Sequence, residues 1–117
     1  MAFMLLIVEK QGDRASRSEE QGRALYERML RFGKNLRERG LLMGGDALAT
    51  DSKGKRVSIH NGSRRIVDGP FAEAKEMVGG YFLLGCKSME EAVDVAAECP
   101  AAQWATVEVR EIATCFE

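Results

Sequence analysis

Apolar side chains occupy consecutive positions in two short stretches of the chain, Phe3 to Val8 and Tyr81 to Leu84. A strand that buries one face alternates apolar and polar residues, so consecutive apolar positions predict strands covered on both faces. Residues Ala105 to Arg110 alternate instead, as is typical of a strand nearer a sheet edge. The pattern therefore predicts two central strands and one outer strand.

Two segments carry apolar residues at helical spacing. The first is predicted to begin near Ser16 or Ser18, because Glu19 and Gln21 follow at the spacing of capping boxes. Gly40 is expected to end it. Its buried stripe is predicted to contain Leu25, Met29, Phe32 and Leu36, broadened by Tyr26 and Leu30.

The second helix is predicted to start at Ser88, which forms a capping box with Glu91, and to stop before Pro100. Its packing side is expected to contain Met89, Ala92, Val93, Ala96 and Cys99. With a second strand between the first helix and the hairpin, the order becomes β-α-β, a hairpin, then β-α-β. This order predicts an α+β, ferredoxin-like sheet.

Two helices can cover only one face of such a sheet. The apolar residues on its other face need a partner, most simply the same face of a second copy across a twofold axis. We therefore predict a homodimer of the dimeric α+β barrel type.

The segment Arg56 to Val67 turns at Asn61-Gly62, the dipeptide preferred in a type I′ hairpin. Its flanks are polar. An added β-hairpin at this place could lengthen the sheet edge, form the rim of a pocket or exchange contacts with the partner chain. The sequence leaves these three alternatives open.

The length of 117 residues predicts one domain, residues 1–117. The apolar start of the chain is too short to span a membrane and lacks the features of a signal peptide, so a cytoplasmic protein is expected. The chain contains an odd number of cysteines, and none of them are in a C-x-x-C spacing: Cys86, Cys99 and Cys115. Neither a disulfide framework nor a metal site is expected.

Charge is unevenly distributed along the chain. Residues 1–67 contain 14 Lys/Arg and 8 Asp/Glu, whereas residues 68–117 contain 3 and 10. The basic residues are interrupted by glutamates and are not interleaved with aromatic residues, and the sequence pI is about 5.9. We therefore interpret the basic half as a solvated face, which can also attract the acidic half, and expect no nucleic-acid partner.

The run Asp68-Gly69-Pro70-Phe71 is the strongest candidate for chemistry. Gly69 and Pro70 constrain the turn, so the Asp68 carboxylate can act as a base or accept a ligand hydrogen bond. Alternatively, Asp68 only bonds the amides of its own turn, and Phe71 anchors the core. Glu73 follows on what Pro70 predicts to be one helical turn.

The Tyr81 hydroxyl follows Gly79-Gly80 and can reach a pocket if these glycines let a ligand approach the backbone. Asp68 and Glu73 are the catalytic candidates. The predicted ligand-binding residues are Asp68, Gly69, Pro70, Phe71, Glu73 and Tyr81.

This motif, the segment from Tyr26 to Leu48 and the ending around Cys99-Pro100 resemble the YCII-related family, DGPF-domain subgroup, over nearly the whole chain. The resemblance implies a ferredoxin-like α+β fold and a dimer that binds a small organic ligand, with a lyase- or isomerase-like reaction as one outcome. No cofactor is expected, since the sequence contains no evident metal, nucleotide or flavin motif.

Some YCII-type proteins are thought to pair a first-helix histidine with an aspartate. Residues 26–39 contain no histidine here, and His60 beside the hairpin turn is expected at the surface. The resemblance also implies an alternative function: a non-enzymatic regulatory or interaction module that binds a sigma-factor-related protein through the basic hairpin and the first helix.

Overall fold

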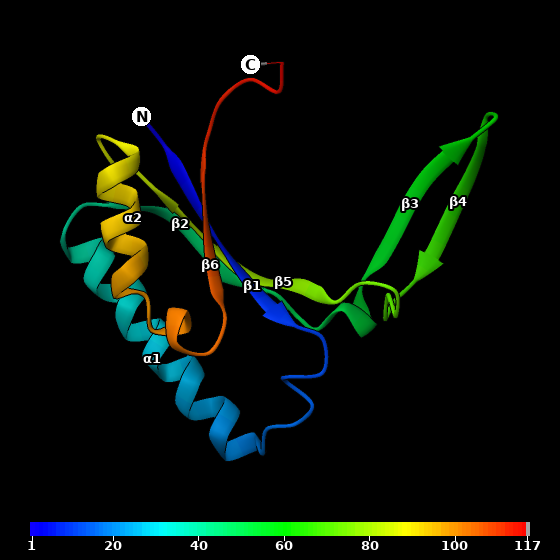
Figure 1. The fold of residues 1–117 in the computed structure, drawn as a ribbon, viewed down its shortest axis with the longest axis horizontal. Helices are drawn as coiled ribbons and strands as arrows, with labels where there is room; N and C mark the ends of the chain where they lie inside the picture. The colour runs from blue at the N-terminus through cyan, green and yellow to red at the C-terminus, as the bar shows by residue number, and fades with distance from the viewer. Residues whose placement is uncertain (117) are drawn as a thin grey trace.

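The computed structural model describes residues 1–116 as a four-stranded antiparallel sheet with two helices on one face and a projecting hairpin (Figure 1). The elements are β1 (Phe3–Lys10), α1 (Glu19–Glu38), β2 (Leu42–Ala47), the short helix η1 (Asp51–Lys53), β3 (Lys55–His60), β4 (Ser63–Asp68), β5 (Glu76–Leu84), α2 (Met89–Glu98), the short helix η2 (Pro100–Gln103) and β6 (Thr106–Glu111). The strand order β2-β5-β1-β6 confirms the predicted α+β, ferredoxin-like arrangement, with β1 and β5 central.

Capping fixes the starts of both helices as predicted. The Ser18 hydroxyl accepts a hydrogen bond from the Gln21 amide at 3.1 Å, and the Gln21 side chain accepts one from the Ser18 amide at 2.9 Å. The Ser88 hydroxyl accepts from the Glu91 amide at 3.1 Å. In the described residues the Glu91 side chain does not bond back to the Ser88 amide, so only half of the predicted capping box forms there. Gly40, with φ of 73°, allows the chain to leave α1 in a left-handed conformation.

The core lies between the helices and one face of the sheet. Alternate residues of β1 are buried there, and the Phe32 ring of α1 meets the Phe82 ring of β5 edge-on, with centroids 5.2 Å apart. The largest fully buried side chains are Phe3, Leu5, Leu36, Leu84, Cys86, Val95 and Cys99.

The predicted helix faces need correction at five positions. In α2, Met89 and Val93 are exposed and Val95 is buried instead, because the helix meets the sheet through positions 92, 95, 96 and 99. In α1, Tyr26 and Leu30 are exposed by 52% and 54%. Only the later part of α1, around Phe32, is buried in the core, and its earlier part borders a cavity.

The opposite face of the sheet is not covered by any described element (Figure 1). β1 alternates buried and half-buried residues, and the half-buried ones point to this open face. They pair across the sheet with Tyr81 and Leu83 of β5. The open face therefore carries apolar side chains that are typical of an interface: Met4, Leu6, Val8 and Leu83.

β3 and β4 form a separate two-stranded sheet, so the hairpin does not lengthen the main sheet. Asn61 and Gly62 both have positive φ, 49° and 79°, as a type I′ turn requires. Every residue of β3 and β4 is exposed, including His60, as expected.

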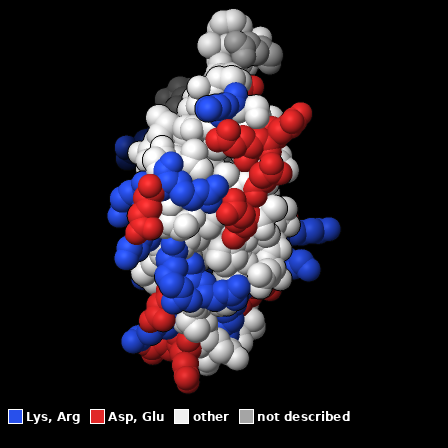
Figure 2. Space-filling view, turned by 90° about the vertical axis from the view of Figure 1, so that its left-hand side faces the viewer, with Lys and Arg blue, Asp and Glu red and all other residues white. Residues whose placement is uncertain are grey.

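The helical side of the molecule carries mixed charges. Figure 2 shows lysine and arginine side chains interspersed with aspartate and glutamate over this face, which agrees with a solvated surface. Within residues 1–116, no helix is both long enough and apolar enough to cross a membrane.

Candidate functional site

A cavity of about 590 Å³ lies between α1 and the helix-facing side of the sheet, and we call it the α1 cleft. Its volume is within the range of ordinary small-molecule sites. β1, β2 and β5 supply its floor, α1 one wall and the segment after η2 one end. Its apolar lining includes Ile7, Leu25, Met29, Leu42, Phe82 and Trp104.

Two glycines of α1 help to leave this space open. A Cβ atom on Gly22 would meet nothing within 4 Å, and one on Gly33 would lie 3.5 Å from the Phe82 ring. The two glycines line the same cleft, since eleven residues correspond to about three helical turns. Glycine inside a helix costs about 1 kcal/mol relative to alanine. Two glycines on one side of a helix are therefore a sequence signal for an open space beside it, and the sequence-based prediction missed this signal.

A buried ion pair stands at the end of the cleft where β1 leads into α1. The Glu9 carboxylate accepts a hydrogen bond from Arg14 Nε at 2.7 Å, and Glu9 is only 6% exposed. Arg14 also donates to the carbonyls of Leu48 at 2.7 Å and Gly79 at 3.0 Å. The pair ties the β1–α1 loop to the segment just after β2 and to β5. No other charged residue in 1–116 is buried.

The charged lining of the cleft favours an anion. Arg17, Lys34 and Arg37 line the cleft and make no ion pair within the described chain. Of the three acidic lining residues, Glu9 is paired with Arg14, and Glu19 is paired with Arg23 at 2.8 Å. The third, Asp46, accepts a hydrogen bond from the Tyr81 hydroxyl at 3.5 Å, so three unpaired cations face one unpaired carboxylate. Uncompensated cations beside an apolar lining can hold a carboxylate or phosphate on an apolar body.

The two predicted catalytic carboxylates lie elsewhere, at the base of the hairpin. Asp68 forms an ion pair with Lys55, and Glu73 forms one with Arg56 at 2.8 Å. Both carboxylate side chains are largely exposed, 73% for Asp68 and 75% for Glu73. Neither residue lines the α1 cleft.

Position 69 requires glycine because the backbone of Asp51 lies too close for a side chain. Its φ is not positive, but a Cβ there would collide with the Asp51 carbonyl. The Asp51 carboxylate accepts hydrogen bonds from the Gln11 side chain and from the Phe71 amide at 3.3 Å. The amide of Phe71 therefore bonds Asp51, although the sequence predicted that amides of this turn bond Asp68.

The prediction of a helical turn after Pro70 is wrong, because residues 70–75 form one hydrogen-bonded turn and no helix. The Ala74 amide donates to the Phe71 carbonyl at 2.9 Å in a single turn, and the chain then enters β5, where Glu76 pairs with Lys10 of β1. Pairing with β1 satisfies the backbone groups that a helix would have bonded internally.

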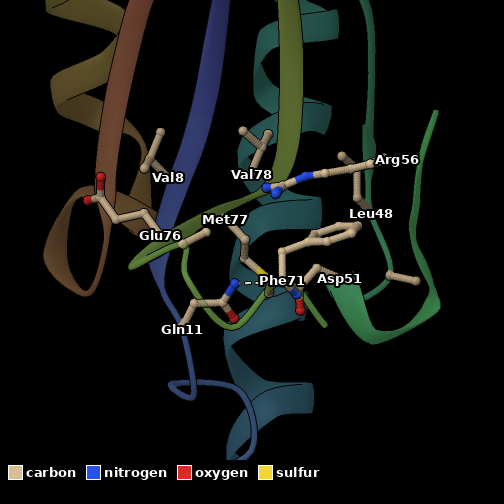
Figure 3. A pocket seen from close by; sticks show the side chains of 11 residues that line it. Val8, Gln11, Leu48, Asp51, Arg56, Phe71, Glu76, Met77 and Val78 are labelled. Atoms are coloured by element: carbon tan, nitrogen blue, oxygen red, sulfur yellow. Dashed lines mark hydrogen bonds between the residues drawn. The ribbon is translucent and has the colours of Figure 1, made fainter. Parts of the chain in front are cut away.

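Phe71 lies outside the main core, contrary to the expected core anchor. Its ring lies 3.8 Å from the Arg56 guanidinium carbon and lines a second cavity of about 330 Å³ (Figure 3). This corner cavity lies where the hairpin meets the sheet, since Arg56 of β3 faces Val8 and Val78 across it. Phe71 is half-buried, and its ring packs against Arg56 instead of against the helices.

Tyr81 points to the open face, where it pairs with Leu6 of β1. Its hydroxyl lies 3.5 Å from the Asp46 carboxylate, and Tyr81 lines neither the α1 cleft nor the corner cavity. Among the six predicted ligand-binding residues, Phe71 alone lines one of these two cavities.

The cysteines are free thiols in three settings. Burial raises the pKa of the Cys99 thiol, and its sulfur lies 3.9 Å from the Met29 sulfur. Burial, reinforced by Glu91, also raises the pKa of Cys86. Cys115 is exposed. Cys99 is therefore a neutral thiol packed in the core.

The comparisons with known proteins assign the family. The chain is 43% identical over 54 residues to a protein of Rhizobium meliloti (strain 1021) described as uncharacterized. That match spans 44% of each chain, so it covers less than half the length of the relative. The model of the YCII-related domain matches residues 1–115. The chain therefore belongs to the YCII-related family.

Proposed function

We propose that the protein is a homodimer that binds a small organic anion in the α1 cleft. The observation that carries the proposal is a cavity of about 590 Å³ with an apolar lining and three cations, Arg17, Lys34 and Arg37, that have no ion pair within residues 1–116. Such a site combines apolar burial of the ligand body with charge recognition of one end.

Within this cleft, Glu9 is the group best placed for proton transfer in a lyase- or isomerase-like reaction. It is buried and held by Arg14, whose three side-chain nitrogens contact β1, Leu48 just after β2, and β5. Orientation by a fixed partner is what a general base needs. The reaction then depends on a ligand whose acidic proton lies within hydrogen-bond reach of this carboxylate.

The run Asp68-Gly69-Pro70-Phe71 supports placing the chain in the DGPF subgroup. In this structure its residues position the hairpin, and the prediction that Asp68 and Glu73 act on a ligand remains a prediction. Asp68→Asn tests it directly, because loss of ligand binding in that variant would move the site to the hairpin base.

The sharpest test of the cleft uses Gly22. Gly22→Leu places a side chain into the cavity without a backbone clash, while the control Gly22→Ala leaves most of the cavity open. A thermal-shift screen of aliphatic and aromatic carboxylates and phosphates compares both variants with wild type. We expect hits to be kept by Gly22→Ala and abolished by Gly22→Leu; hits kept by Gly22→Leu would contradict the proposal.

The dimer is supported by the apolar residues of the open face, such as Leu6 and Leu83, which are only half-buried in one chain. Pairing two open faces across a twofold axis covers them. Light scattering at micromolar concentration is expected to give twice the chain mass of 12.9 kDa, and a monomer would contradict it.

A second candidate function is a regulatory module that binds a sigma-factor-related protein. The observation that favours it is the fully exposed hairpin, which carries Arg64 and Arg65 near its tip. Co-purification with such a protein, lost when the hairpin is removed, would support this candidate over the ligand-binding one.

A further inference from the structure

We propose that the β3–β4 hairpin is an arm that clasps a second copy of this chain. The inference rests on the proposed homodimer and adds to it that the partner chain lies between the open face of the sheet and the hairpin.

The hairpin carries apolar side chains that are exposed to solvent in the single chain. Val57, Ile59 and Ile66 are exposed by 63%, 65% and 49%. The register pairs Val57 with Ile66, so these residues share one face of the hairpin. An isolated two-stranded hairpin is marginally stable in water, so this face requires another surface.

The hairpin and the open face form two walls of an angle (Figure 1). The hairpin leaves the body beside the start of β5 and turns away from the helices (Figure 1). The corner cavity lies where the walls meet, with Val8 and Val78 on the sheet side and Arg56 on the hairpin side. A chain that covers the open face also meets the hairpin at this corner.

The base of the hairpin is built to hold this angle. The Gly69 amide donates to the Gly54 carbonyl at 2.9 Å and closes the two strands. Arg56 lies on the Phe71 ring and pairs with Glu73, and Asp51 bonds the Phe71 amide. A fixed arm loses little conformational freedom when it meets a partner, and this favours association.

The exposed area of one chain leaves enough surface for both contacts. The chain exposes 8197 Å², whereas a compact monomer of its mass exposes about 6,300 Å². The excess of about 1,900 Å² is larger than the roughly 800 Å² that each partner buries in an interface of standard size. The radius of gyration is likewise 16.0 Å, against about 13 Å for a compact chain of this length.

Charge also favours a second copy. Residues 55–68 contain Lys55, Arg56, Arg64 and Arg65 but only one carboxylate. The pairing register places three carboxylates on the open face of the sheet, those of Asp46, Glu76 and Glu108, together with two cations, Lys10 and Arg110. Arg110 pairs with Glu108 at 3.2 Å. In a twofold dimer each basic arm meets a partner face on which carboxylates outnumber cations by three to two, and both contacts form together.

The test compares dimer dissociation constants by sedimentation equilibrium. In one variant, a two-residue Asn-Gly link replaces residues 55–68 between Gly54 and Gly69. In another, Val57, Ile59 and Ile66 become threonine, which keeps the strand propensity and removes apolar surface. Ser58→Thr, on the other face of the hairpin, is the control.

We expect both arm variants to weaken the dimer about tenfold or more, as loss of a central apolar contact does, and the control to leave it unchanged. A wild-type monomer would overturn the proposed dimer together with the arm. A wild-type dimer that is unaffected in both arm variants would overturn the arm alone and assign the hairpin to a different protein.

Discussion

Gly79 and Glu9 share one small space on the floor of the α1 cleft. A Cβ on Gly79 would collide with the Glu9 carboxylate and lie 2.7 Å from Arg14 Nη2. Gly79 is also the extra residue in the bulge where β5 passes Ile7 and Val8 of β1. The bulge and the missing side chain together make room for a buried carboxylate.

Gly79→Ala should therefore displace both Glu9 and Arg14. We expect the free energy of unfolding to fall by about 1–3 kcal/mol, as overpacking commonly causes, and ligand binding in the cleft to weaken. Urea unfolding measures the first effect. Gly44→Ala is the matched control, because a Cβ on this strand glycine meets nothing within 4 Å; equal losses in both variants would contradict the account.

Arg14→Gln should leave the Glu9 carboxylate buried without its counter-charge. Breaking a buried pair costs about 3–5 kcal/mol, and we expect about 3 because the Arg14 side chain is 32% exposed. The double variant with Glu9→Gln should regain much of that loss, since no charge is then stranded. Additive losses in a double-mutant cycle would show that the two residues are not coupled.

Gly69→Ala should loosen the hairpin base, because the new Cβ would force the chain away from the Asp51 carbonyl. We expect faster amide hydrogen exchange in β3 and β4 and little change in β1. Gly44→Ala again provides the comparison. Unchanged exchange in the hairpin would mean that the Asp51 contact does not hold the arm.

Cys99 should make stability depend on alkaline pH. Burial raises its pKa in the folded state, so the neutral thiol is favoured by folding. The resulting stabilisation is complete below the unfolded pKa of about 8.5 and is lost as pH rises through the folded pKa. Urea unfolding between pH 7.5 and 10 should show a shallower decline in Cys99→Ala than in wild type or the exposed control Cys115→Ala.

Much of the fold could be predicted because its determinants are local. Ser18 and Ser88 cap their helices through residues three positions away, Gly40 and Asn61-Gly62 adopt positive φ, and the apolar run from Phe3 marks a central strand. Helical periodicity located the helices. It did not choose between Val93 and Val95, because that choice depends on the angle at which α2 meets the sheet.

The α1 cleft could not be predicted in the same way. Glu9, Arg14 and Gly79 come together through strand pairing across 65 residues, and none belongs to a conspicuous motif. The conspicuous run at Asp68 proved to be the base of the hairpin. Its glycine meets a backbone carbonyl from η1, a contact that no sequence spacing reveals.

The contrast between the buried and exposed thiols has a practical consequence. Because Cys86 and Cys99 are buried and Cys115 is exposed, Cys115 is the accessible attachment point among the three thiols of residues 1–116. In the proposed dimer, a nitroxide on Cys115 would put one spin label on each protomer. Pulsed electron resonance would then report one inter-label distance, and its change on arm removal would follow the geometry of the assembly without any engineered cysteine.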